Sequence, residues 1–239
     1  MRAHGESGNP GGKPGLIGLP RRALFFWAAL VPLAYAPSFV LANRPGALET
    51  LLIAAAAAIA FGAVLGADRV APLEAKLGPA MPVVLGLFAV FYTGIATATA
   101  QARLQAVGDY SQSALFGQSF WTLLHGHPFA NTHETLDGTL GSHFGVHFSP
   151  TLLLLTPFYA LWPRPLVLLA FQSLAIALIP VPVYALLGPR TGRVAAALFG
   201  LAAVAMIGLV WAGPIDFFDA NFLPVLVLAM IWALERRRR

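Results

Sequence analysis

The residues best suited to chemistry are gathered in one stretch of the chain, residues 101–150. Five of the six histidines lie there, together with three carboxylates, Asp109, Glu134 and Asp137. Long apolar segments flank the stretch on both sides. An apolar chain that concentrates its polar side chains in one loop is expected to carry its site in that loop.

One chemistry open to these residues is metal binding. His143 and His147 are spaced i, i+4, which would place both imidazoles on one helical face. Glu134 or Asp137 would then supply a third ligand. Gly145 weakens a helix between the two histidines, and the sequence has no His-Glu-x-x-His pattern. The leading expectation is therefore no cofactor, with a divalent metal as the alternative.

The other chemistry is a carboxylate that acts as a base on an acceptor hydroxyl, which requires one well-placed carboxylate at a membrane face. Asp109 follows the apolar segment 81–100 and is placed for this role, although Gly108-Asp109 is also a common turn pair. Asp216 and Asp219 lie in a second polar segment. From the residues alone they are best interpreted as a solvated turn between helices, and the alternative is that they contribute to the same site.

The elements that must position these residues are membrane helices. Hydrophobic residues make up 58% of the 239 residues, and charged residues make up 10%, against roughly 25% in a soluble domain. No soluble fold of this length would bury so much apolar surface. The net charge of +5 comes mostly from the two ends, so nucleic-acid binding is not expected. The long apolar segments lie at residues 23–41, 48–65, 81–100, 166–187, 194–211 and 222–234.

A shorter apolar piece, residues 151–162, decides between six and seven membrane crossings. If it spans, seven of the fifteen basic residues lie inside, and if it does not, twelve do. Because basic residues favour the cytoplasmic side, six crossings are favoured, with both termini inside and this piece as a short or re-entrant helix on the outer face. The sequence therefore predicts an all-α, polytopic transmembrane helical bundle of six to seven helices in the plasma membrane. It comprises a disordered cytoplasmic tail at residues 1–20 and a single transmembrane domain at residues 21–239.

The external loop, residues 101–150, is predicted to contain one short amphipathic helix at residues 112–124. Leucine and phenylalanine recur there at helical spacing, and serine and glutamine hold the other positions. Such a helix can lie in the membrane interface. The segment 125–128 (His-Gly-His-Pro) ends it, and residues 129–145 are expected to be irregular and able to wrap a ligand.

Several motifs carry a resemblance to a known family. They comprise Phe116, Gln118 and Trp121, then His125-Gly126, the run 147–150 (His-Phe-Ser-Pro), and stretches at residues 165–172, 182–184 and 215–218. These motifs, in this order, resemble domain-of-unknown-function family 2079, a family of multi-pass membrane proteins. The resemblance extends over about residues 81–234.

That family in turn resembles the GT-C glycosyltransferases, membrane enzymes that take sugars from polyprenyl-phosphate donors. The resemblance implies a transferase that acts on a polyprenyl-phosphate-linked sugar at the extracytoplasmic face of the lipid bilayer. It also implies that Asp109 is the catalytic base or orients the acceptor. The substrate-binding residues that we expect with it are Gln118, Trp121, His143, His147, Arg103, Arg164, Asp216 and Asp219.

Other outcomes remain open. Gly117 stands where the family usually has an acidic residue, and family members are usually much longer. A truncated remnant, or a chain that pairs with a C-terminal partner half, is therefore also expected. The alternative function is non-enzymatic, as a transporter component or an assembly partner. Transporters place polar residues within their spans, whereas these spans are nearly free of ionisable groups, which favours a surface site.

Overall fold

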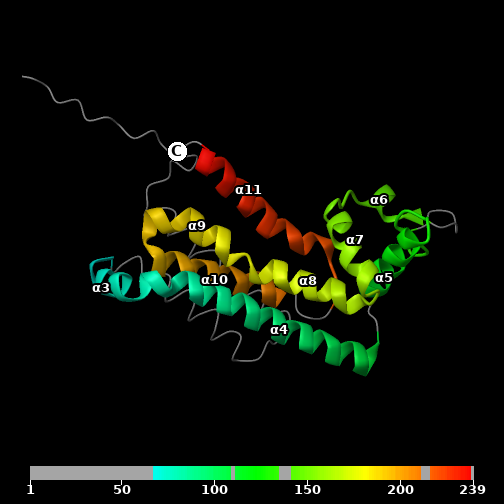
Figure 1. Ribbon diagram of the computed structural model, residues 1–239, viewed down its shortest axis with the longest axis horizontal. Helices are drawn as coiled ribbons and strands as arrows, with labels where there is room; N and C mark the ends of the chain where they lie inside the picture. Colours follow the sequence, from blue (N-terminus) through cyan, green and yellow to red (C-terminus); the bar gives the residue numbers. More distant parts are fainter. Residues whose placement is uncertain (1–66, 109–110, 135–140, 211–215, 238–239) are drawn as a thin grey trace, which may run out of the picture.

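The computed structural model describes residues 67–108, 111–134, 141–210 and 216–237. These residues form an elongated bundle, in which long helices run along one axis and a group of short elements lies at one end (Figure 1). Three sequence expectations fall outside the described residues: the tail at 1–20 and the apolar segments at 23–41 and 48–65.

The first described stretch consists of helix α3 (Ala67–Leu77), the short 3-10 helix η1 (Gly78–Ala80) and helix α4 (Met81–Val107). With 27 residues, α4 is about 40 Å long and extends beyond the predicted segment 81–100. Pro72–Ala106 is long and apolar enough to cross a membrane. Only 17% of its apolar window is buried in the protein, so most of α4 faces outward.

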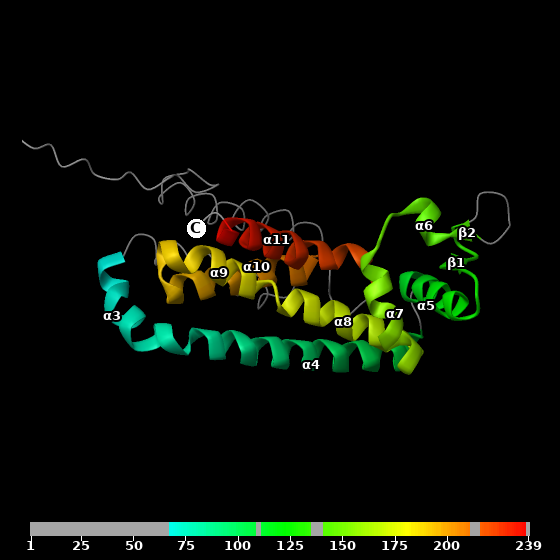
Figure 2. The ribbon, with the colours of Figure 1, turned by 45° about the horizontal axis from the view of Figure 1, so that its top comes forward.

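The second such stretch is Pro165–Thr191, formed by α8 (Pro165–Ala177) and α9 (Pro180–Thr191). Pro180 has no amide hydrogen to donate, so the regular helical hydrogen bonding is interrupted just before α9. Here 56% of the apolar window is buried. This stretch is therefore the central part of the bundle, and Figure 2 shows α8 and α9 in line above α4.

Helix α10 (Arg193–Val210) packs along α9, and their backbones approach closely. A Cβ atom on Gly200 would lie 2.7 Å from Cα of Pro180, so only glycine allows this contact. Helix α11 (Leu223–Arg237) begins near the short elements and ends beside α9 (Figure 1). Both helices match the predicted apolar segments 194–211 and 222–234.

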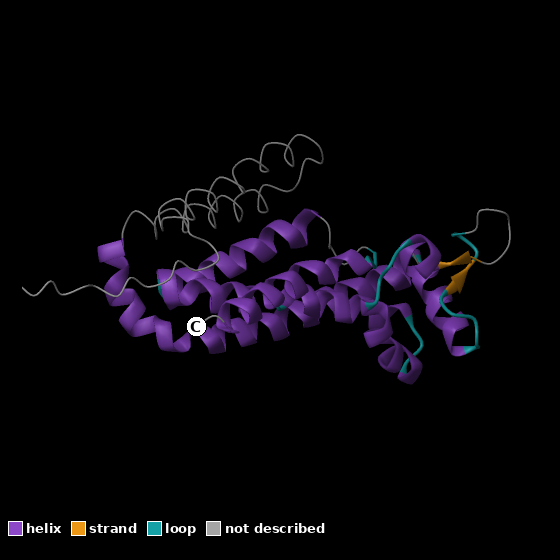
Figure 3. Cartoon of the chain, turned by 90° about the horizontal axis from the view of Figure 1, so that it is seen from above, coloured by secondary structure: helices purple, strands orange, loops and turns teal. Residues whose placement is uncertain are grey.

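At the end of the bundle away from α3, the short elements include two strands, which corrects the prediction of an all-α fold. Figure 3 shows a small strand pair beside the helices there, in which Ala130 lies opposite Ser142 and Asn131 opposite Gly141. Residues 129–145 were expected to be irregular, because strands of two residues are too short to show an alternating pattern. The elements are α5 (Ser111–Leu124), β1 (Ala130–Asn131), β2 (Gly141–Ser142), α6 (His143–Val146), α7 (Thr151–Leu161) and η2 (Asp219–Phe222).

Helix α5 confirms the predicted helix at 112–124, but its polar positions are not solvent-facing. Ser113 and Ser119 are 1% and 0% exposed, because α5 is enclosed by β1, α7 and α8. Gln112 and Gln118 are half-buried, so the polar side of this amphipathic helix faces the protein more than the solvent. Its apolar residues belong to the core of this end, which contains Leu115, Phe116, Phe120, Phe129, Leu152, Leu155, Tyr159, Leu168, Leu169 and Phe217.

Helix α7 stays at the same end as α5. It packs against α5, α8 and η2, and both views of the ribbon place it beside α5 rather than along the bundle (Figures 1 and 2). Its 11 residues make about 16 Å of helix, roughly half the thickness of a hydrocarbon core.

Candidate functional site

The polar segment before α11 is fixed against the end that carries the loop. Gln172 of α8 is fully buried, and its Nε2 donates to the backbone oxygen of Asp216 at 2.9 Å. The Oε1 of Gln172 accepts a hydrogen bond from the backbone nitrogen of Phe218 at 2.7 Å. Phe217, between them, packs edge-on against Phe116 of α5 with ring centroids 4.8 Å apart. The side chain of Gln172 thus fixes residues 216–218 against α8. In this position Phe217 contacts α5, which belongs to the polar loop.

Asp216 is a structural residue of this junction. Its Oδ1 accepts hydrogen bonds from the backbone nitrogen and the hydroxyl of Ser113, both at 2.6 Å, and its Oδ2 accepts from the backbone nitrogen of Gln112 at 3.1 Å. These are free amides at the start of α5, so Asp216 caps a helix that lies 103 residues earlier. It is 7% exposed, and the interpretation as a solvated turn is wrong for this residue.

Asp219, three residues later, lies in a different environment. It accepts a hydrogen bond from the hydroxyl of Ser149, which is 70 residues away in the sequence. Its Oδ2 also lies 3.8 Å from Nε2 of His143, and its side chain remains 23% exposed. Asp219 is therefore a carboxylate held by the loop on one side and open to solvent on the other.

His143 joins Asp219 to the strand pair. Its ring is 3% exposed, and its Nδ1 lies 2.8 Å from Oε1 and 3.0 Å from Oε2 of Glu134. Both ring nitrogens therefore face carboxylates, an arrangement that favours the imidazolium form. Asn131 holds Glu134 in place, because its Nδ2 donates to Oε2 of Glu134 at 2.7 Å. The edge of the His143 ring packs against Phe116 at a centroid distance of 4.8 Å.

The electrostatics of the cluster act in opposite directions on the acid and the base. Burial by itself lowers the pKa of His143, but Asp219 and Glu134 outweigh it and raise the pKa above its usual value. Burial by itself raises the pKa of Asp219, but His143, Ser149 and the backbone of Ala220 outweigh it and lower the pKa. The cluster therefore favours the ionised form of Asp219, and it stabilises the imidazolium form of His143 relative to an isolated histidine.

Two buried donors near Asp219 are incompletely satisfied among the residues that the structure describes. Nε2 of His143 has no partner within hydrogen-bonding distance, and neither has Nδ2 of Asn221. Asn221 lies in η2 together with Asp219 and is 6% exposed. Because unsatisfied buried donors cost free energy, they mark this part of the junction as able to accept a further polar group.

His147 is the solvent-facing member of the histidine pair. A short helix, α6, does form despite Gly145, and the rings of His143 and His147 lie 5.4 Å apart between centroids. Only His143 is buried, while His147 is exposed. The structure thus buries one imidazole of the pair and leaves the other open to solvent. Within the described ranges no group of three histidine or acidic side chains could hold a metal ion, and Asp137 lies outside those ranges.

Gln118 and Trp121 serve different purposes. Oε1 of Gln118 accepts hydrogen bonds from the backbone and hydroxyl of Thr132, both at 3.1 Å, which ties the strand pair to α5. Trp121 is 53% exposed and stacks on His125 at a centroid distance of 3.9 Å. Gln118 is thus occupied within the protein, and Trp121 faces outward.

The remaining predicted residues lie around the same end. Arg103 is half-buried in the last part of α4. Arg164 is exposed just before α8, with its guanidinium 6.0 Å from the centre of the Trp162 ring. Asp109, the predicted base, lies between α4 and α5 but outside the described residues. Its role stays a prediction.

Sequence reasoning missed three residues of this cluster. Ser149 lies in the motif run 147–150 but was assigned no role, and Asn131 lies in no motif; the roles of both follow from contacts that only the fold creates. Gln172 did offer a signal, because it is the lone amide in the apolar run of α8. A buried amide in a helix of this kind must find partners for both of its polar atoms.

The comparison with known protein families assigns the chain to one of them. A family described as "Predicted membrane protein (DUF2079)" matches residues 102–239, more than half of the chain. The chain belongs to the DUF2079 family. The match confirms the resemblance predicted from the motifs, and it begins later than the expected residue 81. No curated protein and no solved structure matches the chain. The DUF2079 part contains every element of the Asp219 cluster.

Proposed function

We propose that this DUF2079 protein is a GT-C-like transferase of the plasma membrane, with six crossings and a site at the extracytoplasmic surface. It would transfer a sugar from a polyprenyl-phosphate donor. The observation that carries the proposal is the cluster around Asp219, in which an ionised, partly exposed carboxylate is held by residues of the polar loop. The GT-C resemblance assigns the catalytic carboxylate of the outer membrane face to Asp109, and Asp219 is a second carboxylate held by the same polar loop.

The arrangement of the helices supports six crossings. Helix α7 is too short to span and packs at the loop end, whereas α8 and α9 together extend along the bundle. Ionisable residues are confined to the ends of the described long helices, for instance Arg103 in α4 and Glu235 in α11. Twelve of the fifteen basic residues then lie on the cytoplasmic side. A site at one end also fits better than a conduction path through the middle of the bundle.

The cluster suggests a division of roles. His143 forms ion pairs with both Glu134 and Asp219. Its role is therefore to position Asp219 and to keep that carboxylate ionised. A carboxylate with a lowered pKa is a weak base but a good acceptor of a hydrogen bond from a sugar hydroxyl. Asp109, which precedes α5 in the sequence, would serve as the base proper. His147, which is exposed, is available to a donor phosphate.

The reaction is tested with membrane vesicles that contain the protein and a radiolabelled polyprenyl-phosphate hexose. Asp109→Asn preserves size but removes the proton acceptor, and it should lower turnover by ~10²-fold or more. Asp219→Asn should lower turnover by about tenfold, since it loses charge but keeps one acceptor oxygen. Glu74→Gln, an acid-to-amide change at the opposite end, is the control and should leave turnover unchanged.

The donor site is tested in the same assay with His147→Ala. Loss of an exposed phosphate partner should raise the apparent KM for the donor more than it lowers kcat. If Asp109→Asn, Asp219→Asn and His147→Ala all behave as wild type, the transferase proposal is wrong, and a non-enzymatic role as a transporter component or assembly partner is preferred.

The topology has its own test. The chain has no cysteine, so single introduced cysteines report directly on accessibility. Thr132→Cys in the loop and Arg237→Cys at the end of α11 both replace exposed residues. In intact cells an impermeant maleimide should label Thr132→Cys only. Labelling of Arg237→Cys would contradict six crossings.

A further inference from the structure

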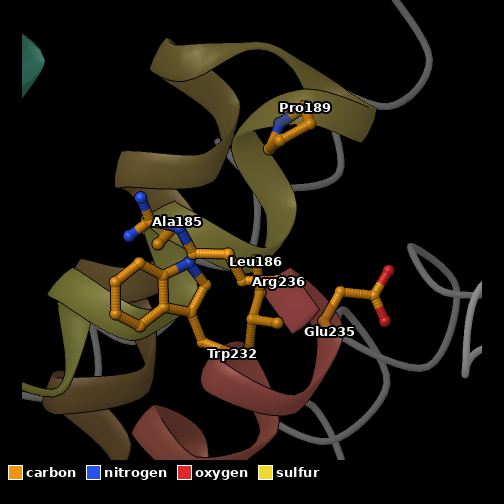
Figure 4. Close-up of a pocket in the computed structure, with 6 residues that line it drawn as sticks. All are labelled: Ala185, Leu186, Pro189, Trp232, Glu235 and Arg236. Atoms are coloured by element: carbon orange, nitrogen blue, oxygen red, sulfur yellow. The ribbon is translucent and has the colours of Figure 1, made fainter. Parts of the chain in front are cut away.

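The end of the bundle opposite Asp219 carries two pockets, one on each side of α9. One, of about 240 Å³, lies between α9 and α11 (Figure 4) and is lined by Ala185, Leu186, Pro189, Trp232, Glu235 and Arg236. The other, of about 490 Å³, lies toward the starts of α4 and α10, and Ala185 and Pro189 belong to both. One arginine lines each pocket: Arg236 lines the first and Arg193 lines the second.

The acidic residue of the first pocket is neutralised within the protein. Glu235 is 8% exposed, and its Oε1 lies 2.5 Å from Nη2 of Arg190. Nη1 of Arg190 also donates to the backbone oxygen of Leu186 at 2.8 Å, which fixes the pair against α9. The carboxylate therefore does not repel an anion as an isolated charge would, and Arg236 gives the pocket its positive character.

Arg236 is oriented by Trp232. Its guanidinium carbon lies 5.7 Å from the centre of the indole ring, a cation–π distance. Figure 4 shows the guanidinium beside the ring and the carboxylate of Glu235 directed the other way. Tryptophan and arginine together at the end of an apolar helix are typical of the headgroup layer of a membrane.

The walls below this arginine are apolar. Ala185, Leu186 and Pro189 form the α9 side, and the indole ring of Trp232 lies on the α11 side. A free phosphate ion has no apolar part that could be buried against these walls. A ligand with an anionic head and hydrocarbon tails matches the whole pocket.

We propose that the pocket between α9 and α11 binds an anionic membrane phospholipid. Arg236 pairs with the phosphodiester, and the first part of the acyl chains lies against the apolar wall formed by Ala185, Leu186 and Pro189 of α9. The site is on the cytoplasmic side, so the proposal rests on the membrane placement proposed above. It does not depend on the transfer reaction, because no residue of the Asp219 cluster takes part.

The test compares two neighbouring arginines in the full chain, purified in detergent. Native mass spectrometry measures binding of phosphatidylglycerol and of phosphatidylcholine. Wild type should prefer phosphatidylglycerol. Arg236→Gln should weaken phosphatidylglycerol binding by about fivefold or more, the effect of one basic residue at the membrane surface. Arg237→Gln removes the same charge one residue further on, outside the pocket lining, and should change binding by less than about twofold.

Equal losses for Arg236→Gln and Arg237→Gln would overturn the proposal, because they would indicate a diffuse charge effect. No preference of the wild type for phosphatidylglycerol would also overturn it, whatever the variants do. A third arm adds inorganic phosphate: displacement of phosphatidylglycerol at millimolar phosphate would identify a free-phosphate site instead. A wild-type lipid preference combined with inactive vesicles would leave the pocket standing and reject only the transferase.

Discussion

The two ends of the bundle both engage carboxylates, but they use them differently. At the α3 end, Glu74 accepts hydrogen bonds from the backbone nitrogens of Arg193 at 2.6 Å and Val194 at 2.9 Å, and so caps α10. Glu235 pairs with Arg190 nearby. At the loop end, Asp216 caps α5 in the same manner. Asp219 differs from these three acids, since besides the backbone of Ala220 its partners are an imidazole and a hydroxyl, and part of it is exposed.

The difference separates structural from functional acids without any knowledge of the ligand. A carboxylate that accepts helix amides has both its charge and its lone pairs in use, and its replacement should cost stability alone. A carboxylate beside a protonated imidazole keeps its charge and has oxygens that a ligand can approach. Asp216 and Asp219 are three residues apart in the sequence, yet they fall on opposite sides of this division.

The sharpest test of the division is Asp216→Ala. This change leaves the buried amides at the start of α5 and the hydroxyl of Ser113 without their acceptor. Each buried group left unsatisfied costs about 1–3 kcal/mol, and the amide of Gln112 is only part-buried. We therefore expect a loss of stability toward the lower end for three groups, about 3–5 kcal/mol. Thermal unfolding in mild detergent, followed by near-UV circular dichroism, measures it.

Asp219→Ala is the matched comparison and should cost clearly less stability, because its carboxylate is partly hydrated already. If Asp219→Ala destabilised the protein as much as Asp216→Ala, the two acids would not differ in the way proposed, and Asp219 would be a structural residue as well.

The long helices were predictable because composition alone indicates them. Apolar runs predicted α10 and α11 to within about three residues, and they predicted α8 and α9 together as one segment at 166–187. For α4 the predicted start was right and the predicted end was too early. The break before Pro180 and the strand pair at Ala130 were missed. Both depend on local backbone geometry rather than on hydropathy. Helix α3 was missed too, since 11 residues between two spans give little signal.

The candidate site was predictable in its residue types but not in its pairings. The scarcity of polar residues pointed to His143, Asp216 and Asp219, because each is costly in an apolar chain. The contact of Asp219 with Ser149 closes 70 residues of chain, and its existence depends on how α8 and α11 pack. Partners and burial distinguish Asp216 from Asp219, and no local sequence pattern reports either of them.

The α3 end gives the second test. Glu74→Ala removes the cap of α10 and should lower the free energy of unfolding by about 1–2 kcal/mol. Glu74→Gln retains one acceptor oxygen and should lose less than half as much. Calorimetry in detergent measures both variants. Neither should alter transfer activity, and a loss of activity with unchanged stability would show that this end is not purely structural.

The smallest effect expected is the dependence of stability on pH. The pKa of His143 is raised in the folded protein, so its contribution is fully present at acidic pH and is lost as the pH rises through the folded pKa. The pKa of Asp219 is lowered, so its contribution is present at neutral pH and is lost as the pH falls through that lowered pKa. The two together predict the greatest stability between these limits, with a decline toward alkaline pH.

His143→Gln identifies the source of that decline. Glutamine can still donate to Glu134 but does not titrate, so the alkaline decline in thermal stability should flatten in this variant. His127→Gln, which replaces an exposed histidine in the turn after α5, should keep the wild-type profile. Thermal unfolding midpoints between about pH 5 and pH 9 decide the outcome. A His143→Gln profile as steep as wild type would mean that the imidazole does not carry the charge, and Asp219 would then need another group to keep it ionised beside the open face of the site.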